Sequence, residues 1–164
     1  MKKIIKKVLI VLSVVFILIQ LYPRDNTNNN PDSSRDIAQL HTVPPPVQNI
    51  LKTACYDCHS NQTVYPWYSN IQPVSYWLSD HITEGKKELN FSEFSTYRLA
   101  KQFRKLEEIA KEVKEVEMPL ESYTLIHRDA NLNSDQRLLL ANWTETLRDS
   151  MTKVYPPDSL IRKK

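Results

Sequence analysis

Two cysteines and a histidine form a group whose spacing points to a defined chemistry. Cys55 and Cys58 are the only cysteines of the chain, stand three positions apart, and are followed directly by His59. On one helical turn both thiols face the same side, so they can form thioethers with the two vinyl groups of one porphyrin. The adjacent imidazole can then bind the porphyrin iron. The spacing predicts one covalent haem c per chain, held by Cys55, Cys58 and His59.

Three other interpretations of the cysteine pair explain less of the sequence. A disulfide or thioredoxin-like pair is typical of a βαβ context that the pattern does not show, and it gives His59 no role. A zinc site needs a fourth ligand at finger-like spacing, whereas the next histidine, His81, lies 22 positions on. A purely structural thiol pair is the least favoured.

The second axial position of the iron has several candidate ligands. Met118 follows a long predicted helix and precedes Pro119, so it can lie on a loop across the distal face. A thioether ligand raises the reduction potential and suits electron transfer, although methionine is more often an apolar core residue. His81 and His127 are alternative distal ligands, and an open distal position is the third alternative.

The composition favours an all-α domain. The chain of 164 residues is 41% hydrophobic, and it has ten prolines but one glycine, Gly85. Because tight hairpins need residues at positive φ, a β-rich fold is disfavoured. Apolar spacing predicts five helices, at about 47–55, 74–83, 92–116, 119–126 and 134–154. Pro73 precedes the second helix and Gly85 follows it, while Ser92 and Ser134 are the predicted N-caps of the third and fifth helices. The predicted buried faces are Val47, Ile50, Leu51 and Ala54; Leu99, Phe103, Leu106, Ile109 and Val113; and Leu139, Leu140, Trp143 and Leu147.

The N-terminus combines lysines with an apolar run. Four lysines within the first seven residues precede a fourteen-residue run at 8–21. This pattern predicts a single-pass transmembrane helix in the cytoplasmic membrane, with the following domain on the extracytoplasmic side. A cleaved signal peptide is the alternative, but residues 20–24 offer no small residues for cleavage. Beyond those four lysines the basic and acidic residues nearly balance, so no nucleic-acid partner is expected.

The sequence divides into four predicted segments. Residues 1–23 form the membrane anchor or signal, and the Asn-rich, apolar-poor residues 24–38 form a disordered tether. Residues 39–154 form the haem c-binding domain. Residues 155–164 form a C-terminal tail, because Tyr155, Pro156 and Pro157 end the last helical pattern.

Residues from about Val43 to Leu147 resemble the bacterial haem-binding domain family, small exported proteins common in Bacteroidetes-type bacteria. Two stretches carry the resemblance, CYDCHSNQTVYPWYSNIQPVSYWLSDHITEGKKELNFSEF and MPLESYTLIHRDANLNSDQRLLLANW. The resemblance implies one haem c, with Cys55, Cys58 and His59 at the attachment motif. Met118 matches the family's Met-Pro position, and His127 matches a histidine shortly after it. In related proteins this domain accompanies cytochrome c or dihaem peroxidase modules, which implies redox partners of that kind.

The motif and the resemblance together predict a membrane-anchored monohaem electron carrier with a small cytochrome c-like domain. Other cytochromes or a dihaem peroxidase are its expected redox partners. The alternative is a haem enzyme or sensor, peroxidase-like or gas-binding, with an open or labile distal site. A structural or assembly subunit is a third hypothesis. A non-enzymatic carrier is favoured over an enzyme.

Overall fold

A computed structural model describes residues 1–23, 28 and 33–161. The described residues form helices and loops without a β-strand, so the predicted all-α class is confirmed for them. The α-helices are α1 (Lys2–Ile19), α2 (Ile37–Leu40), α3 (Pro45–Ala54), α4 (Tyr56–His59), α5 (Val74–Glu88), α6 (Leu99–Lys114), α7 (Glu121–Thr124), α8 (Ser134–Val154) and α9 (Pro157–Leu160). The 3₁₀ turns are η1 (Trp67–Asn70), η2 (Phe91–Thr96) and η3 (Arg128–Ala130).

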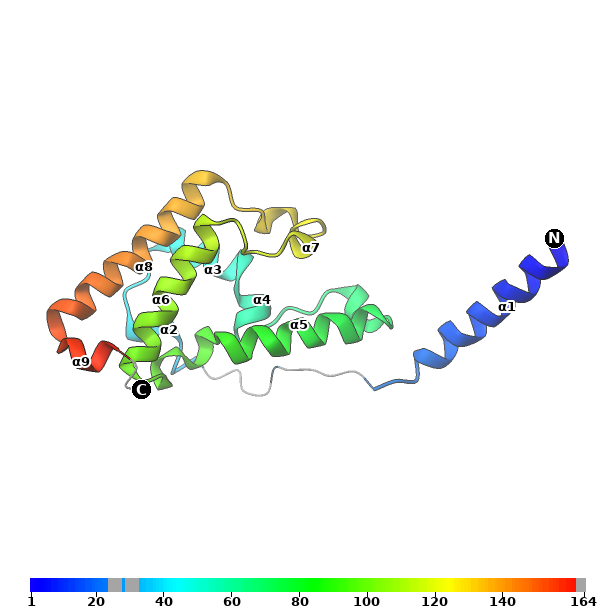
Figure 1. The fold of residues 1–164 in the computed structure, drawn as a ribbon, viewed down its shortest axis with the longest axis horizontal. Coiled ribbons are helices and arrows are strands. Elements are labelled where there is room, and N and C mark those ends of the chain that lie inside the picture. The colour runs from blue at the N-terminus through cyan, green and yellow to red at the C-terminus, as the bar shows by residue number, and fades with distance from the viewer. Residues whose placement is uncertain (24–27, 29–32, 162–164) are drawn as a thin grey trace.

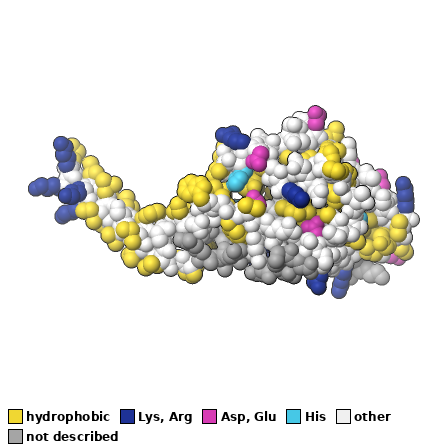
Figure 2. Space-filling model, turned by 180° about the vertical axis from the view of Figure 1, so that it is seen from behind, with side chains coloured by type: hydrophobic (Ala, Val, Ile, Leu, Met, Phe, Trp, Pro, Cys, Tyr) yellow, Lys and Arg dark blue, Asp and Glu magenta, His cyan; other side chains and the backbone are white. Residues whose placement is uncertain are grey.

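The predicted transmembrane helix is wrong. Among the described residues no helix is both long and apolar enough to cross a membrane. Four lysines occupy the first six positions of α1, which leaves residues 8–19 as its apolar part. At a rise of 1.5 Å per residue this part is only about 18 Å long, against a hydrocarbon core of about 30 Å. Figure 1 shows α1 projecting from the other helices, and Figure 2 shows its lysines gathered at the far tip.

The predicted tether falls mostly outside the described residues, which include neither 24–27 nor 29–32. Asn28 is described, and its side chain donates to the Thr63 carbonyl at 2.8 Å and accepts from the Thr63 amide at 3.0 Å. Asp36 and Ile37 are buried, and Asp36 accepts a hydrogen bond from the Tyr56 hydroxyl at 2.9 Å. Core packing therefore includes residues that precede position 39.

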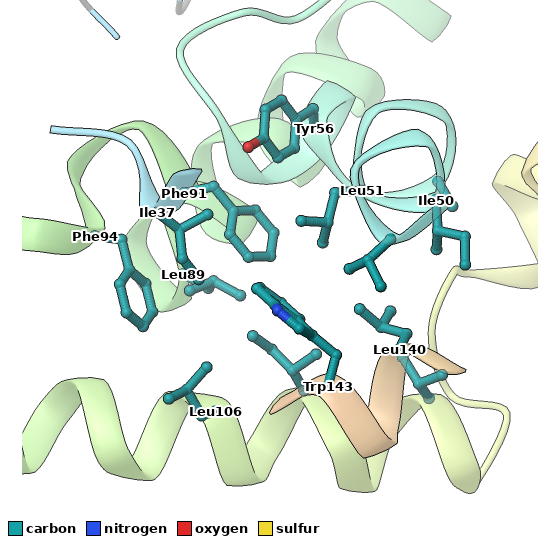
Figure 3. Packing of buried hydrophobic residues seen from close by; sticks show 14 of the residues in the cluster. Ile37, Ile50, Leu51, Tyr56, Leu89, Phe91, Phe94, Leu106, Leu140 and Trp143 are labelled. Atoms are coloured by element: carbon teal, nitrogen blue, oxygen red, sulfur yellow. The ribbon is translucent and has the colours of Figure 1, made fainter. Parts of the chain in front are cut away.

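The core lies between α3, α6 and α8. Helices α6 and α8 lie side by side, and α3 packs against α8. The whole predicted face of α3 is buried, because Val47, Ile50, Leu51 and Ala54 recur at helical spacing. Figure 3 shows Trp143 of α8 in the middle of this cluster. Its indole Nε1 donates to the Thr42 carbonyl at 3.3 Å, so its polar atom is paired as well.

Several helix boundaries differ from the predicted ones. Helix α5 continues to Glu88 and contains Gly85, which was predicted to lie beyond its end. Ser92 lies in η2, which Asn90 caps, and the long helix begins only at Leu99. The cap of α8 is Asn133 instead of Ser134, because Asn133 and Gln136 form a reciprocal capping box. Within the predicted tail, α9 buries Leu160.

The predicted faces of α6 and α8 are buried only in part. Leu106, Ile109 and Val113 of α6 are core residues, whereas Leu99 and Phe103 pack at the edge of the core. In α8, Leu140 is fully buried but its neighbour Leu139 is 41% exposed. One 100° step around the helix separates the two side chains, which is enough to move the second one to the surface.

The two neighbouring leucines of α8 allow a matched test of the core. Leu140→Ala should lower the free energy of unfolding by about 2–5 kcal/mol, because it leaves a cavity beside Trp143. Leu139→Ala removes the same atoms from a half-exposed site and should cost about 1 kcal/mol or less. Urea unfolding followed by far-ultraviolet circular dichroism measures both values. Equal losses in the two variants would contradict the described register of α8.

Candidate functional site

The cysteine motif sits at the junction of two helices. Cys55 follows the last residue of α3 and precedes the single turn of α4, which carries Cys58 and His59. The Cys55 amide donates to the Leu51 carbonyl at 3.0 Å, and the His59 amide donates to the Cys55 carbonyl at 2.9 Å. The buried face of α3 therefore fixes the start of the motif, and a turn of backbone hydrogen bonds fixes the rest.

The imidazole of His59 has a defined chemical form. Its Nδ1 faces the carbonyl oxygens of Gly85 at 2.9 Å and Leu89 at 3.0 Å. Carbonyl oxygens only accept hydrogen bonds, so Nδ1 carries the proton and Nε2 keeps its lone pair. Burial lowers the pKa of His59 and so favours this neutral form, although the two carbonyls partly oppose that shift. A neutral imidazole oriented through one nitrogen is the usual form of a metal-binding histidine.

Gly85 brings α5 against the motif. A Cβ atom at this position would lie 2.8 Å from the Cys58 carbonyl oxygen, closer than the backbone allows. The absence of a side chain therefore permits both the close approach of α5 and the hydrogen bond from His59 to the Gly85 carbonyl. The sequence held one signal for this role, since Gly85 is the only glycine of the chain.

Among the described residues, two cavities of about 260 Å³ or more adjoin the motif. One, of about 350 Å³, is lined by Cys58, His59, His81, Met118 and Tyr123, among others. The other, of about 260 Å³, has Cys55 in its wall. Both His59 and Met118 line both cavities, so the fold brings these two distant residues to one cleft.

Hydrogen bonds hold the Met118 loop in place. The Met118 amide donates to the Glu112 carbonyl at 3.2 Å, and the chain turns at Val116, whose φ is 63°. The Arg137 guanidinium of α8 donates to the Val113 carbonyl at 3.1 Å and to the Met118 carbonyl at 2.8 Å. The end of α6 and the Met118 loop are therefore attached to the same side chain of α8.

A second connection joins α7 to the cysteine motif. The Tyr123 hydroxyl donates to the Asp57 carboxylate at 2.7 Å, and Asp57 lies between the two cysteines. Burial, followed by this hydrogen bond, raises the pKa of Tyr123, so the hydroxyl keeps its proton. The segment after Met118 is thus fixed to the motif at its other end.

The structure separates the two alternative distal histidines. His127 Nε2 forms a 2.6 Å hydrogen bond with the Tyr68 hydroxyl, and its ring stacks on Tyr123 at 4.3 Å. It lines neither cavity that His59 and Met118 share. His81 does line the larger cavity, where its Nδ1 donates to the Trp77 carbonyl at 2.9 Å and its ring packs against Trp77.

The thiols lack the lowered pKa that a redox-active cysteine pair needs. Burial, and then the charge of Cys58, raises the pKa of Cys55 to about 12. Burial, and then the charge of Asp57, raises the pKa of Cys58 to about 11. Both thiols are therefore protonated at neutral pH, whereas a thioredoxin-like pair needs a lowered thiol pKa.

The site also lacks the ligand set of a bare metal ion. Within the described part of the chain, no three His, Cys, Asp or Glu side chains are placed to hold one. A porphyrin iron needs fewer protein ligands, because four nitrogens of the macrocycle already bind it. His59 Nε2, the apolar wall residues Phe91 and Ile109, and the adjoining cavities fit such a flat, largely apolar group.

A comparison with protein families agrees with this geometry. Residues 14–146 match the haem-binding domain family. This match covers most of the chain, which therefore belongs to that family, and the resemblance noted in the sequence is confirmed. The comparison shows haem binding. Searches of curated proteins and of solved structures found no match.

The contact at Gly85 reverses the usual effect of a helix substitution. At a solvent-facing helix position, Gly→Ala stabilises a protein by about 1 kcal/mol. Here Gly85→Ala should destabilise the chain by about 1–3 kcal/mol, because the added methyl group must push α5 away from the Cys58 carbonyl. Thermal unfolding of the chain measures the change, with Lys87→Ala on the exposed side of α5 as the control. A stabilised Gly85→Ala variant would contradict the described approach of α5.

Proposed function

We propose that this protein is a monohaem c-type cytochrome that transfers electrons outside the cytoplasm. The observation that carries the proposal is the arrangement around His59. Its Nδ1 is saturated by two carbonyls, its Nε2 keeps a lone pair, and both cysteines stand on the same turn. These are the features needed to attach a haem through sulfur and to bind its iron from one side.

Each side chain has one task in this proposal. The Cys55 and Cys58 thiols would hold the haem through thioether bonds, each formed by adding S–H across one vinyl group, so that no oxidant would be consumed. When bound, haem supplies the one-electron couple of its iron. His59, through Nε2, and Met118, through its sulfur, would hold the iron. Arg137 and the Tyr123–Asp57 hydrogen bond hold the Met118 segment, which limits rearrangement when the electron count changes.

Location and partners follow from the same chemistry. Four lysines ahead of an apolar run are typical of an export signal, and c-type haem is attached outside the cytoplasm. A protein with both axial positions filled has no place for a substrate, so it would exchange electrons with other redox proteins. Cytochromes or a dihaem peroxidase are the partners that the family resemblance suggests.

A haem enzyme or sensor is the second candidate. One observation favours it, because His81 and Tyr123 line the same cavity as Met118 and could contact a small ligand there. That function requires Met118 to be absent from the iron or easily displaced. Carbon monoxide binding separates the candidates, since a carrier with a firm Met118 ligand should bind it slowly or not at all.

The covalent attachment is tested by mass and by extraction. After export from a host with haem-attachment machinery, the chain should gain the mass of one haem and keep its colour in acidified acetone. The Cys55→Ala, Cys58→Ala double variant should release all haem under the same treatment, because no thioether remains. Haem that washes out of the unaltered chain would exclude a c-type cytochrome while leaving haem binding intact.

The distal ligand is tested by optical spectroscopy. A ferric haem bound by methionine is low-spin and shows a weak sulfur-to-iron charge-transfer band. Met118→Ala should remove this band, turn the ferric haem high-spin and accelerate carbon monoxide binding to the ferrous form. His127→Ala should leave the band in place, because His127 lies outside the shared cavities. An unaltered chain whose low-spin ferric haem lacks the band, and which turns high-spin in His81→Ala but not in Met118→Ala, would reassign the distal ligand to His81.

A further inference from the structure

Lys105 is an unusual residue in the cleft wall. It lies on α6 with its side chain only 5% exposed, and among the described residues it is the one Lys or Arg that lines either of the two cavities. Lysine is almost never this buried unless a partner compensates its charge. A lysine on this face of α6, beside Leu106 and Ile109, therefore requires an anionic partner.

The two glutamates that pair with Lys105 have side chains that are partly or largely exposed to solvent. Its Nζ donates to Glu108 at 2.6 Å and to Glu88 at 3.1 Å. The Glu88 side chain is 78% exposed, and Glu108 is 37% exposed and also paired with Arg104. Because both carboxylates reach solvent, either one can turn away from the ammonium when another anion takes its place beside Lys105. The buried ammonium cannot leave, so it is the fixed member of the cluster.

The ligand of this cleft brings its own anions. Haem carries two carboxylates, and burying a carboxylate without a cation costs a large free energy. Glu88, Glu108 and Glu112 line the same cavity and would repel it, whereas Lys105 would attract it. The charge arrangement thus offers one favourable position for a carboxylate inside the cleft.

We propose that Lys105 binds a carboxylate of the haem, which replaces Glu88 as its partner. This inference rests on haem binding and is independent of electron transfer. It gives the buried lysine a function in cofactor recognition. It also makes the protein selective for a porphyrin that carries free carboxylates.

The test compares haem with its dimethyl ester, in which both carboxylates are neutral. The full chain with Cys55→Ala and Cys58→Ala binds reversibly, so the affinity for each porphyrin is measured by absorbance titration. Haem should bind about tenfold more tightly than the ester, as expected for one charge-assisted hydrogen bond. Adding Lys105→Met should reduce this preference to about twofold or less, by weakening the binding of haem more than that of the ester.

Two further variants secure the interpretation. Lys111→Met, on the exposed side of α6, should keep the tenfold preference, which excludes a general effect of charge. Glu88→Gln removes the competing carboxylate and should increase the preference for haem over its ester. If circular dichroism shows that Lys105→Met does not fold, the Glu88→Gln result decides the question. An unchanged preference in the folded Lys105→Met variant, or an unchanged or smaller one in Glu88→Gln, would overturn the proposal. A background chain that binds neither porphyrin would instead contradict the haem cleft itself.

Discussion

The two hydrogen bonds from His59 Nδ1 to backbone carbonyls set the conditions for everything else at the site. They determine which nitrogen carries the proton, how the ring is oriented, and which edge of it remains available to a metal. Because the acceptors are the Gly85 and Leu89 carbonyls, the end of α5 must lie against the motif. The position of one imidazole therefore specifies the packing of a whole helix.

The close approach of α5 explains why the one glycine lies inside a helix. Glycine weakens a helix interior, so its presence there needs a compensating gain. The gain is contact with the Cys58 backbone, which no residue with a Cβ could make without displacement. The Gly85 carbonyl then accepts from both the Leu89 amide and His59, and the Leu89 carbonyl, directly after the end of α5, is the second acceptor for His59.

The rest of the domain acts as a frame for the cleft. Buried leucines and Trp143 pack α3, α6 and α8 into one cluster, which holds Cys55 at one end of α3. The same cluster positions Arg137, whose guanidinium holds the loop that brings Met118 to the cleft. The segments that carry His59 and Met118 are thus both attached to a single apolar core. Lys105 differs from these apolar residues, because its buried positive charge needs a negatively charged partner close by.

The sequence alone was enough to predict the family, the all-α class and the buried face of α3, because each of these depends on residue type and local spacing; covalent attachment through Cys55 and Cys58 stays a prediction. It also singled out Met118, although the distal ligand itself stays a prediction. The predicted end of α5 and the predicted start of α6 were wrong, because Gly85 resembles a helix stop signal and Ser92 resembles a helix N-cap. The sequence also predicted a transmembrane helix, and this was wrong. Between the lysines at the start of α1 and the end of that helix, too few apolar residues remain to cross a membrane. Only the tertiary structure showed why Gly85 is needed, how His59 is oriented, and that Met118 and Lys105 face one cleft. These features depend on contacts between residues far apart in the chain, and such contacts follow from the packing of the whole core.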